Sequence, residues 1–462
     1  MGLVRWLLPI VCVGVLVAAP TAAPPPYYAI RDARIVPVTG SIIERGTIVL
    51  SDGLITAVGA SVTVPPEAEV IDGTGLTVYP GLIDTLTTIG LPRSQRAQPS
   101  ADAERSPSSP SASSQPRRPA SRGPEDRPGS TPWALAADSL QAEDERVEEW
   151  RSAGFTAAVV APSRGILPGQ ASVVNLAGER PGDMVVAPSV ALPISLEPLE
   201  RAAGFPSSLM GVLAYVRQTF LDARHGMAVE EAYEKTPRGQ KRPEYDRTVE
   251  AVSQVLAERR PILLPATNRP QILRMLDFAR ELELNAAIYG AQGAYDVAEA
   301  VAAGKLPMLV SLKWPEQAKD ADPEEDVSLR VLRFRERAPS TPAALTKAGV
   351  KFAFYSDGLA TPKEVLKNVR RALDAGLTRE AALRAFTQDA ADIYGVGNRL
   401  GSLETGKIAN VLVTEGELFD EKTKVALVFV DGQKFEPVDQ PAEPDEKPTT
   451  SLASGDAERG RP

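Results

Sequence analysis

The sequence is poor in the side chains that usually bind transition metals. Its 462 residues include one histidine, His225, and one cysteine, Cys12. Zinc and iron sites need several imidazole, thiolate or carboxylate ligands. The chain therefore cannot form a histidine-ligated metal site. Cys12 lies inside an apolar run near the N-terminus and not at its end, so we expect no lipid-attachment cysteine and no disulfide in the mature protein.

Long apolar runs are also scarce. The run at residues 6–19 follows Arg5 and, at about 14 residues, is too short to span a bilayer comfortably. The small residues at 21–23 complete a pattern typical of a secretory signal, which we assign to residues 1–23. We expect an exported protein, periplasmic or extracellular, that has no membrane association once the signal is removed.

Clustered basic charge is the third absence. The net charge is -9, and the segments expected to fold contain no basic cluster that could follow a phosphate backbone. Nucleic acid is therefore not an expected partner. The 43% hydrophobic content is enough for a large buried core, which places the chain in the globular class.

Two segments have a biased composition. Residues 92–131 are rich in Pro, Ser, Arg and Ala, and the tail at 438–462 is rich in Pro, Asp and Glu. Neither can bury enough apolar surface to offset the entropy lost on ordering. We predict that both are disordered. The small excess of arginine in the first could contact an acidic surface, although a solvated loop is the simpler interpretation.

The remaining sequence changes its pattern twice. Short β-type runs at 33–38, 46–51 and 54–58, separated by turn pairs such as Asp52-Gly53, indicate a small antiparallel lobe. Apolar runs then alternate with amphipathic helices, which predicts parallel strands with crossover helices. The expected buried strands are 156–161, 262–266, 286–290, 308–312 and 352–356. Short β runs return at 409–414 and 425–430, before a turn at Asp431-Gly432.

Helix signals agree with this alternation. Thr361 is expected to cap a helix that has Pro362 first and Glu364 third, and a last helix is expected over 378–394. We assign residues 24–80 and 396–437 to one β lobe and residues 81–395 to the α/β domain. Without the insert, that domain approaches the roughly 250 residues of a (β/α)₈ barrel.

Three motifs carry a family resemblance. The first runs from Ala33 through 46–59 and 70–75 to Pro80-Gly-Leu-Ile-Asp84; the second is Ser356-Asp357-Gly358; the third spans 401–413 and ends at 430–432. Together they resemble the amidohydrolase superfamily, in particular its imidazolonepropionase-like and dihydroorotase-like secreted members. The resemblance implies an α/β fold with a distorted (β/α)₈ TIM barrel and a small β-sandwich lobe assembled from both chain ends.

The resemblance also implies a chemistry. Active relatives hold one or two metal ions at the carboxyl ends of the strands, where a metal lowers the pKa of a bound water toward neutrality. An aspartate on the last strand takes the proton of that water, and amide or cyclic-amide C–N bonds are hydrolysed.

This sequence departs from that ligand set. Relatives follow Pro-Gly-Leu-Ile-Asp with a His-x-His pair, whereas Leu86 and Thr88 stand at these positions. An aliphatic side chain has no lone pair to donate, and one hydroxyl is a poor substitute for imidazole. Further ligands are expected at the ends of the fifth and sixth strands, near 265–266 and 289–290, and none is a histidine. We therefore predict degenerate ligand positions, no bound metal and no other cofactor.

Other residues are candidates for the same site. Asp357 alone matches the catalytic set of the family, while Asp84 belongs to the frame motif and is expected to be structural. A carboxylate at 357 could equally be kept for hydrogen bonds at a strand-to-helix turn. The loop at 163–170 could lie at the pocket mouth. The polar pocket candidates near predicted strand ends are Arg164, Gln170, Asn268, Lys313 and Tyr355. We expect His225 to be a solvated or helix-terminal residue.

Three interpretations remain. The chain could be a catalytically degenerate homologue with a binding or partner role, taking a small amide or peptide-like ligand or associating with an active relative. It could still be a C–N hydrolase with a metal-free or carboxylate-only site centred on Asp357, although oxygen-ligated cations usually need several carboxylates. A purely structural exported protein has no positive support in the sequence.

Overall fold

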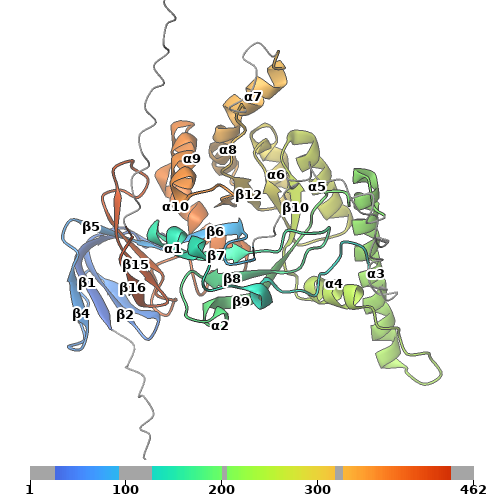
Figure 1. The fold of residues 1–462 in the computed structure, drawn as a ribbon, viewed down its shortest axis with the longest axis horizontal. Coiled ribbons are helices and arrows are strands. Elements are labelled where there is room, and N and C mark those ends of the chain that lie inside the picture. Colours follow the sequence, from blue (N-terminus) through green and yellow to red (C-terminus); the bar gives the residue numbers. More distant parts are fainter. Residues whose placement is uncertain (1–26, 93–126, 200–204, 318–325, 439–462) are drawn as a thin grey trace, which may run out of the picture.

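The computed structural model describes residues 27–92, 127–199, 205–317 and 326–438 (Figure 1). The predicted signal segment at 1–23, most of the predicted insert and nearly all of the predicted tail lie outside these residues. The end of the insert is described, and there Arg127 forms ion pairs with Asp222 (2.7 Å) and Asp246 (3.1 Å). The predicted boundary at residue 131 therefore lies inside a packed segment.

The lobe is one eight-stranded sheet built from both ends of the chain (Figure 1, blue and red strands). Its strand order is β16-β15-β14-β5-β1-β2-β3, and β4 pairs with β1. The strands are β1 Tyr28–Ile35, β2 Ile43–Ser51, β3 Leu54–Gly59, β4 Glu69–Asp72, β5 Leu76–Pro80, β14 Val411–Glu415, β15 Lys424–Val430 and β16 Gln433–Phe435. Most pairs are antiparallel as predicted, but β4 and β5 run parallel to β1.

The predicted turns of the lobe are confirmed. Asp52 and Gly53 join β2 to β3, and Asp431 and Gly432 join β15 to β16, with positive φ at all four residues. Two-residue hairpins need this conformation because it matches the twist of the flanking strands. The interior of the lobe is aliphatic, with Tyr28 packed edge-on against Phe429 at 5.2 Å between ring centroids.

The second sheet is the barrel, and its eight strands follow the chain in order from β6 to β13. They are β6 Leu82–Thr87, β7 Phe155–Val160, β8 Ala171–Asn175, β9 Val185–Pro193, β10 Ile262–Ala266, β11 Ala286–Gly290, β12 Met308–Ser311 and β13 Phe352–Tyr355. The sheet nearly closes where Thr85 Oγ1 on β6 donates to the Phe354 carbonyl of β13 at 2.7 Å. The predicted fold class, a distorted (β/α)₈ barrel with a separate β lobe, is confirmed.

The distortion lies at β8, which runs antiparallel to both β7 and β9. The prediction of parallel strands with crossover helices is wrong here. The connection from Val160 to Ala171 is shorter than the dozen or more residues that a parallel crossover needs. All five residues of β8 are buried, so its apolar pattern contains no information on strand direction.

Helices cover the outside of the barrel (Figure 1). They are α1 Glu145–Ser152, α2 Pro181–Met184, α3 Leu209–Lys235, α4 Arg247–Ala257, α5 Arg269–Glu281, α6 Ala298–Gly304, α7 Leu329–Arg337, α8 Thr341–Lys347, α9 Pro362–Asp374, α10 Arg379–Phe386 and α11 Gln388–Ile393. Within the described ranges, no helix combines the length and the apolar character needed to cross a membrane.

The helix signals are partly confirmed. Thr361 caps α9 as predicted, accepting a hydrogen bond from the Glu364 N–H. The single helix expected at 378–394 is instead two helices, because Thr387 leaves helical geometry at φ -129° and ψ -100°. Its hydroxyl donates to the Leu383 carbonyl at 2.6 Å. Such back-bonding competes with the helical ladder, and a periodic apolar pattern does not reveal it.

One asparagine joins the lobe to the barrel. Asn410 donates through Nδ2 to Asn175 Oδ1 of β8 at 2.8 Å and accepts at Oδ1 from the Asp431 N–H at 2.8 Å. Its carbonyl accepts from the Gly81 N–H at 2.9 Å. Asn410 and Asn175 are 6% and 3% exposed, so water cannot easily replace these partners.

We predict that Asn410→Ala destabilises the protein by about 2–4 kcal/mol, because it leaves the Asn175 amide and the Asp431 N–H without partners. Urea unfolding measures this change. Asn398→Ala is the matched control, since Asn398 is exposed. An Asn410→Ala variant as stable as the control would show that this joint does not stabilise the fold.

Candidate functional site

The carboxyl ends of β6, β7, β9, β11 and β13 surround a cavity of about 730 Å³. Cavities that bind small molecules typically measure about 300–1,000 Å³. In barrels of this type, ligands bind at the carboxyl ends of the strands. We call this space the barrel-end cavity.

Four residues singled out in the sequence line the barrel-end cavity: Leu86, Thr88, Tyr355 and Asp357. Leu86 belongs to β6 and Thr88 follows it, whereas Tyr355 ends β13 and Asp357 follows that strand. Because the first and last strands meet where the barrel closes, residues more than 250 positions apart share one wall.

Arg164 and Gln170 belong to the loop predicted at the pocket mouth but do not themselves line the cavity. Their loop does, through Ser163 and Pro168. Arg164 is exposed. Gln170 is 3% exposed and serves the scaffold, because its Nε2 donates to the Pro132 carbonyl at 2.9 Å and its Oε1 accepts from Arg260 at 2.8 Å.

Asn268 and Lys313 are also absent from the cavity lining. Asn268 is the N-cap of α5, where its side chain accepts from the Gln271 N–H at 3.2 Å in a capping box. A strand-end asparagine that precedes a helix is a strong cap candidate, and this simpler role explains the sequence signal. Lys313 is exposed, but its charge still acts on Asp357.

Asp357 is held by a chain of hydrogen bonds behind the cavity wall. Ser311 Oγ donates to Asp357 Oδ2 at 2.8 Å and accepts from Gln292 Nε2 at 3.2 Å and from the Lys313 N–H at 3.1 Å. Since both acceptor positions of Ser311 are used, its proton points to Asp357. Asp357 itself has φ +53°, a left-handed conformation that costs energy for a non-glycine residue.

The environment shifts the titration of Asp357. Burial of part of the carboxyl raises its pKa above the ordinary value, while the hydrogen bond from Ser311 and the charge of Lys313 oppose the rise. Ser311, which is bonded to Asp357, and Gln292, which is bonded to Ser311, were not identified from the sequence. The only available signal was that Ser311 is a polar residue inside a buried strand pattern.

Two tyrosines form another wall of the cavity. Tyr289 on β11 and Tyr355 on β13 pack edge to face, with ring centroids 6.5 Å apart and an interplanar angle of 79°. The Tyr289 hydroxyl donates to the Ile194 carbonyl at 2.8 Å. Burial, together with the charges of Glu197 and Asp357, raises the pKa of Tyr289 far above its usual range, so the phenol stays neutral. Tyr289 occupies the sixth-strand end, where a metal ligand was expected.

The residues at the expected ligand positions do not fit a catalytic metal ion. Leu86 lies on the first strand and Thr88 follows it. Ala266 ends the fifth strand, and the Tyr289 hydroxyl is hydrogen-bonded to the Ile194 carbonyl. Over the described parts of the chain, no three His, Cys, Asp or Glu side chains converge as a metal site would require. Asp357 is the one carboxylate at a family ligand position.

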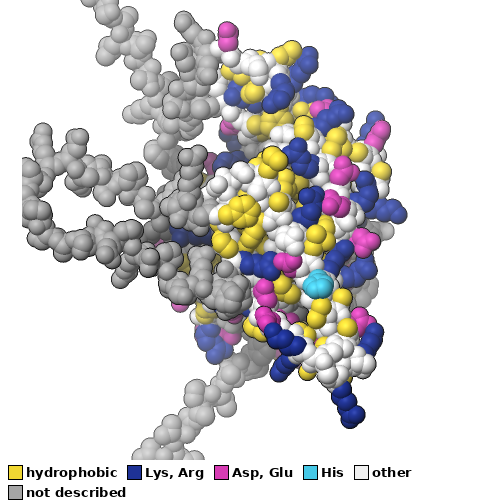
Figure 2. All heavy atoms as spheres, turned by 90° about the vertical axis from the view of Figure 1, so that its right-hand side faces the viewer, with side chains coloured by type: hydrophobic (Ala, Val, Ile, Leu, Met, Phe, Trp, Pro, Cys, Tyr) yellow, Lys and Arg dark blue, Asp and Glu magenta, His cyan; other side chains and the backbone are white. Residues whose placement is uncertain are grey.

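His225 is remote from these positions. It lies within the long helix α3 and is exposed, on the face of the molecule that Figure 2 presents, where histidine is cyan. Its predicted solvated environment is confirmed.

Beside the cavity lies a buried carboxyl group. Asp84 on β6 is 1% exposed, and its Oδ1 accepts from the Ser356 N–H at 3.1 Å, while Oδ2 has no hydrogen-bond partner. Burial raises the pKa of Asp84 to about 6, and hydrogen bonding from Ser356 and the approach of the Trp150 indole N–H oppose the rise. Ser356 and Trp150 both line the barrel-end cavity.

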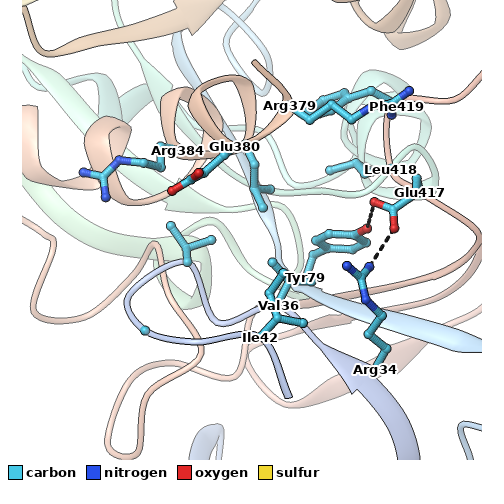
Figure 3. Close-up of a pocket in the computed structure, with 13 residues that line it drawn as sticks. Arg34, Val36, Ile42, Tyr79, Arg379, Glu380, Arg384, Glu417, Leu418 and Phe419 are labelled. Atoms are coloured by element: carbon cyan, nitrogen blue, oxygen red, sulfur yellow. Dashed lines mark hydrogen bonds and ion pairs between the residues drawn. The ribbon is translucent and has the colours of Figure 1, made fainter. Parts of the chain in front are cut away.

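A second cavity, of about 410 Å³, lies between the lobe and α10 (Figure 3). Figure 3 shows Tyr79 and Arg34 both directed at Glu417, with hydrogen bonds of 3.2 and 2.7 Å. Burial, together with Glu417, raises the pKa of Tyr79 to about 12. Arg34, Tyr79 and Glu417 all belong to the lobe and satisfy one another there, which is typical of a structural contact.

Comparisons with known proteins agree with this geometry. Residues 293–435 match the sequence profile of the amidohydrolase family. An amidohydrolase from Thermotoga maritima MSB8 has a similar structure, with a TM-score of 0.69 and 25% identity over 88% of this chain and 100% of that chain. None of the curated protein sequences matches.

More distant structures share the fold. A prolidase complexed with N-methylphosphonate-L-proline has a TM-score of 0.51 and 17% identity, covering 89% of this chain and 99% of its own. Molinate hydrolase has a TM-score of 0.51 and 14% identity, covering 94% of this chain and 100% of its own.

We predict that Asp84 makes the protein less stable as the pH rises. Well below pH 3.8 the carboxyl is protonated in both the folded and the unfolded states. Between the ordinary value of 3.8 and the folded pKa of about 6, the unfolded state loses its proton first, so the free energy of unfolding falls. The fall is on the order of 3 kcal/mol and levels off above about pH 6.

Urea unfolding between pH 4 and 7.5 tests this sign. The difference between wild type and Asp84→Asn should change across that window, because asparagine does not titrate. Asp374→Asn, on the exposed surface of α9, should follow the wild-type profile. Parallel pH profiles for wild type and Asp84→Asn would contradict the assignment.

Proposed function

Because the chain belongs to the amidohydrolase superfamily, we propose that it is an exported member whose barrel-end cavity binds a small organic ligand without metal-dependent hydrolysis. Members of this superfamily are hydrolases that act on C–N bonds, and membership supports that class of activity for the family. The degenerate role rests on one observation, the set Leu86, Thr88, Ala266 and Tyr289 at the expected ligand positions. The signal-like segment at 1–23 supports export to the periplasm or the extracellular space.

The chemistry of Asp357 supports binding over turnover. In active relatives the aspartate takes a proton from a water whose pKa a metal has lowered from about 15.7 to about 7. A carboxylate, even with its pKa raised, is too weak a base to deprotonate ordinary water to a useful extent. Asp357 can still accept a hydrogen bond from a ligand or form an ion pair with it.

A carboxylate-only hydrolase centred on Asp357 is the alternative, and the Ser311–Asp357 contact of 2.8 Å is the observation that favours it. A hydroxyl within hydrogen-bond reach of a base is the usual arrangement of a nucleophile. However, Ser311 is 1% exposed, lies outside the cavity lining and already accepts two N–H groups. This environment favours a positioning role.

The ligand is proposed to be a small molecule, of which amide or peptide-like compounds are one class. An association with an active relative is a further part of the proposal and would leave the cavity free for this ligand. The cavity volume of about 730 Å³ suits a molecule of such size.

We predict that the purified mature protein hydrolyses cyclic amides, N-acyl amino acids and dipeptides no faster than a buffer blank, with or without added Zn²⁺ or Mn²⁺. Any residual activity of the preparation should persist in Asp357→Asn, because it would not arise from this site. The variant should fold and be about 1.5–3 kcal/mol less stable, since the hydrogen bond from Ser311 then reaches a neutral acceptor.

Steady-state kinetics with matched melting curves provide the test, and Asp374→Asn serves as the surface control. A turnover in wild type that falls at least tenfold in Asp357→Asn, with an unchanged melting curve, would promote the carboxylate-centred hydrolase.

A further inference from the structure

The barrel-end cavity carries an excess of negative charge. Asp357 and Glu197 both line it. Tyr289 lines the same cavity, and the charges of both carboxylates act on its hydroxyl. Two carboxylates at one cavity favour a cationic occupant by Coulomb attraction, and because both residues are exposed this attraction is sensitive to salt.

Of the positive charges near the cavity, Arg146 is neutralised by Asp144, whereas Lys313 is exposed, lies outside the lining and still acts on Asp357. Among the described lining residues, Arg146 is the one cation, and its Nε lies 3.0 and 2.9 Å from the two carboxylate oxygens of Asp144. The same guanidinium donates to the carbonyls of Thr88 at 3.0 Å and Leu91 at 3.1 Å. Arg146 therefore fixes the loop after β6 and is not available to an anionic ligand.

The remaining walls are aromatic and aliphatic. Tyr289, Tyr355 and Trp150 line the cavity together with Leu86 and Ile194. Aromatic faces carry negative electrostatic potential and attract ammonium groups, most strongly where the contact is desolvated. The edge-to-face arrangement of the two tyrosines presents ring surface from two directions.

From this juxtaposition we propose that the barrel-end cavity binds an organic cation, an ammonium group on a small apolar body. The inference deepens the proposed function and rests on it. The ammonium group would lie between Asp357 and Glu197 against the tyrosine rings, and the apolar body against Leu86 and Ile194. A bare divalent ion is disfavoured because hard cations require six or more oxygen ligands, and ring faces are not ligands.

The experiment compares ligands of one shape and three charges. The probes are choline, its uncharged isostere 3,3-dimethyl-1-butanol and the anion 3,3-dimethylbutyrate, titrated calorimetrically into the full mature chain. Choline should bind at least tenfold more tightly than the alcohol, and the anion should not bind. Added NaCl should weaken choline binding, as expected for a partly exposed charge contact.

Variants test the walls separately. Glu197 is exposed, so we expect the Glu197→Gln substitution to leave the fold intact. The variant should bind choline about tenfold more weakly than wild type and should bind the alcohol equally well. Tyr355→Phe keeps the ring and should retain choline affinity, whereas Tyr355→Leu should lose it. Glu230→Gln, exposed on α3, is the matched control and should bind as wild type.

The possible outcomes separate the two proposals. Equal affinity for choline and the alcohol would overturn the cation inference while leaving a ligand-binding cavity in place. Failure of choline to bind at millimolar concentrations, or binding that Glu197→Gln does not change, would also overturn it. Turnover that depends on Asp357 would instead overturn the proposed function.

Discussion

The closure of the barrel between β6 and β13 is the contact on which the site depends. Thr85 donates to the Phe354 carbonyl, the Ser356 N–H donates to Asp84, and the Tyr394 hydroxyl donates to the Thr85 carbonyl. The first two bonds join residues near position 85 to residues near position 355, and the third joins Thr85 to the residue that follows α11. They bring Leu86 and Thr88 to the same wall as Asp357, so the closure itself creates the barrel-end cavity.

The barrel closure is intact, whereas the cavity that it creates lacks the residues of a metal site. The buried Asp84, with one oxygen left without a partner, carries an energetic cost that apolar packing would avoid. Where a metal site would need imidazole and carboxylate ligands, the cavity offers two carboxylates and three aromatic rings. A carboxylate can interact with a metal cation or with an organic cation, so Asp357 is chemically compatible with the proposed ligand.

Much of the fold could be predicted from the sequence because the relevant signals are local. The apolar runs predicted β10 and β11 with the bounds that the structure shows. The Thr361-Pro362 pair predicted the start of α9, and the two Asp-Gly pairs predicted hairpin turns. Strand direction at β8 and the break at Thr387 depend on neighbours that are distant in the sequence or on a single hydroxyl, and no periodic pattern reports either.

The site could be predicted only in part for the same reason. Motif spacing located Leu86, Thr88 and Asp357, whereas Gln170 and Asn268 are strand-end polar residues whose partners lie in the scaffold. Ser311 and Glu197 could be assigned to the site only from the structure, which shows the bond from Ser311 to Asp357 and the place of Glu197 in the cavity lining. A polar residue near a strand end is therefore a weak signal until its hydrogen-bond partners are known.

Calorimetric titration of the metal-free mature protein with Zn²⁺ and Mn²⁺ tests the central claim most directly. The account predicts no saturable one-to-one binding, because a single carboxylate at the family ligand positions cannot complete a coordination sphere. Stoichiometric binding at micromolar or lower concentration that disappears in Asp357→Asn would contradict it.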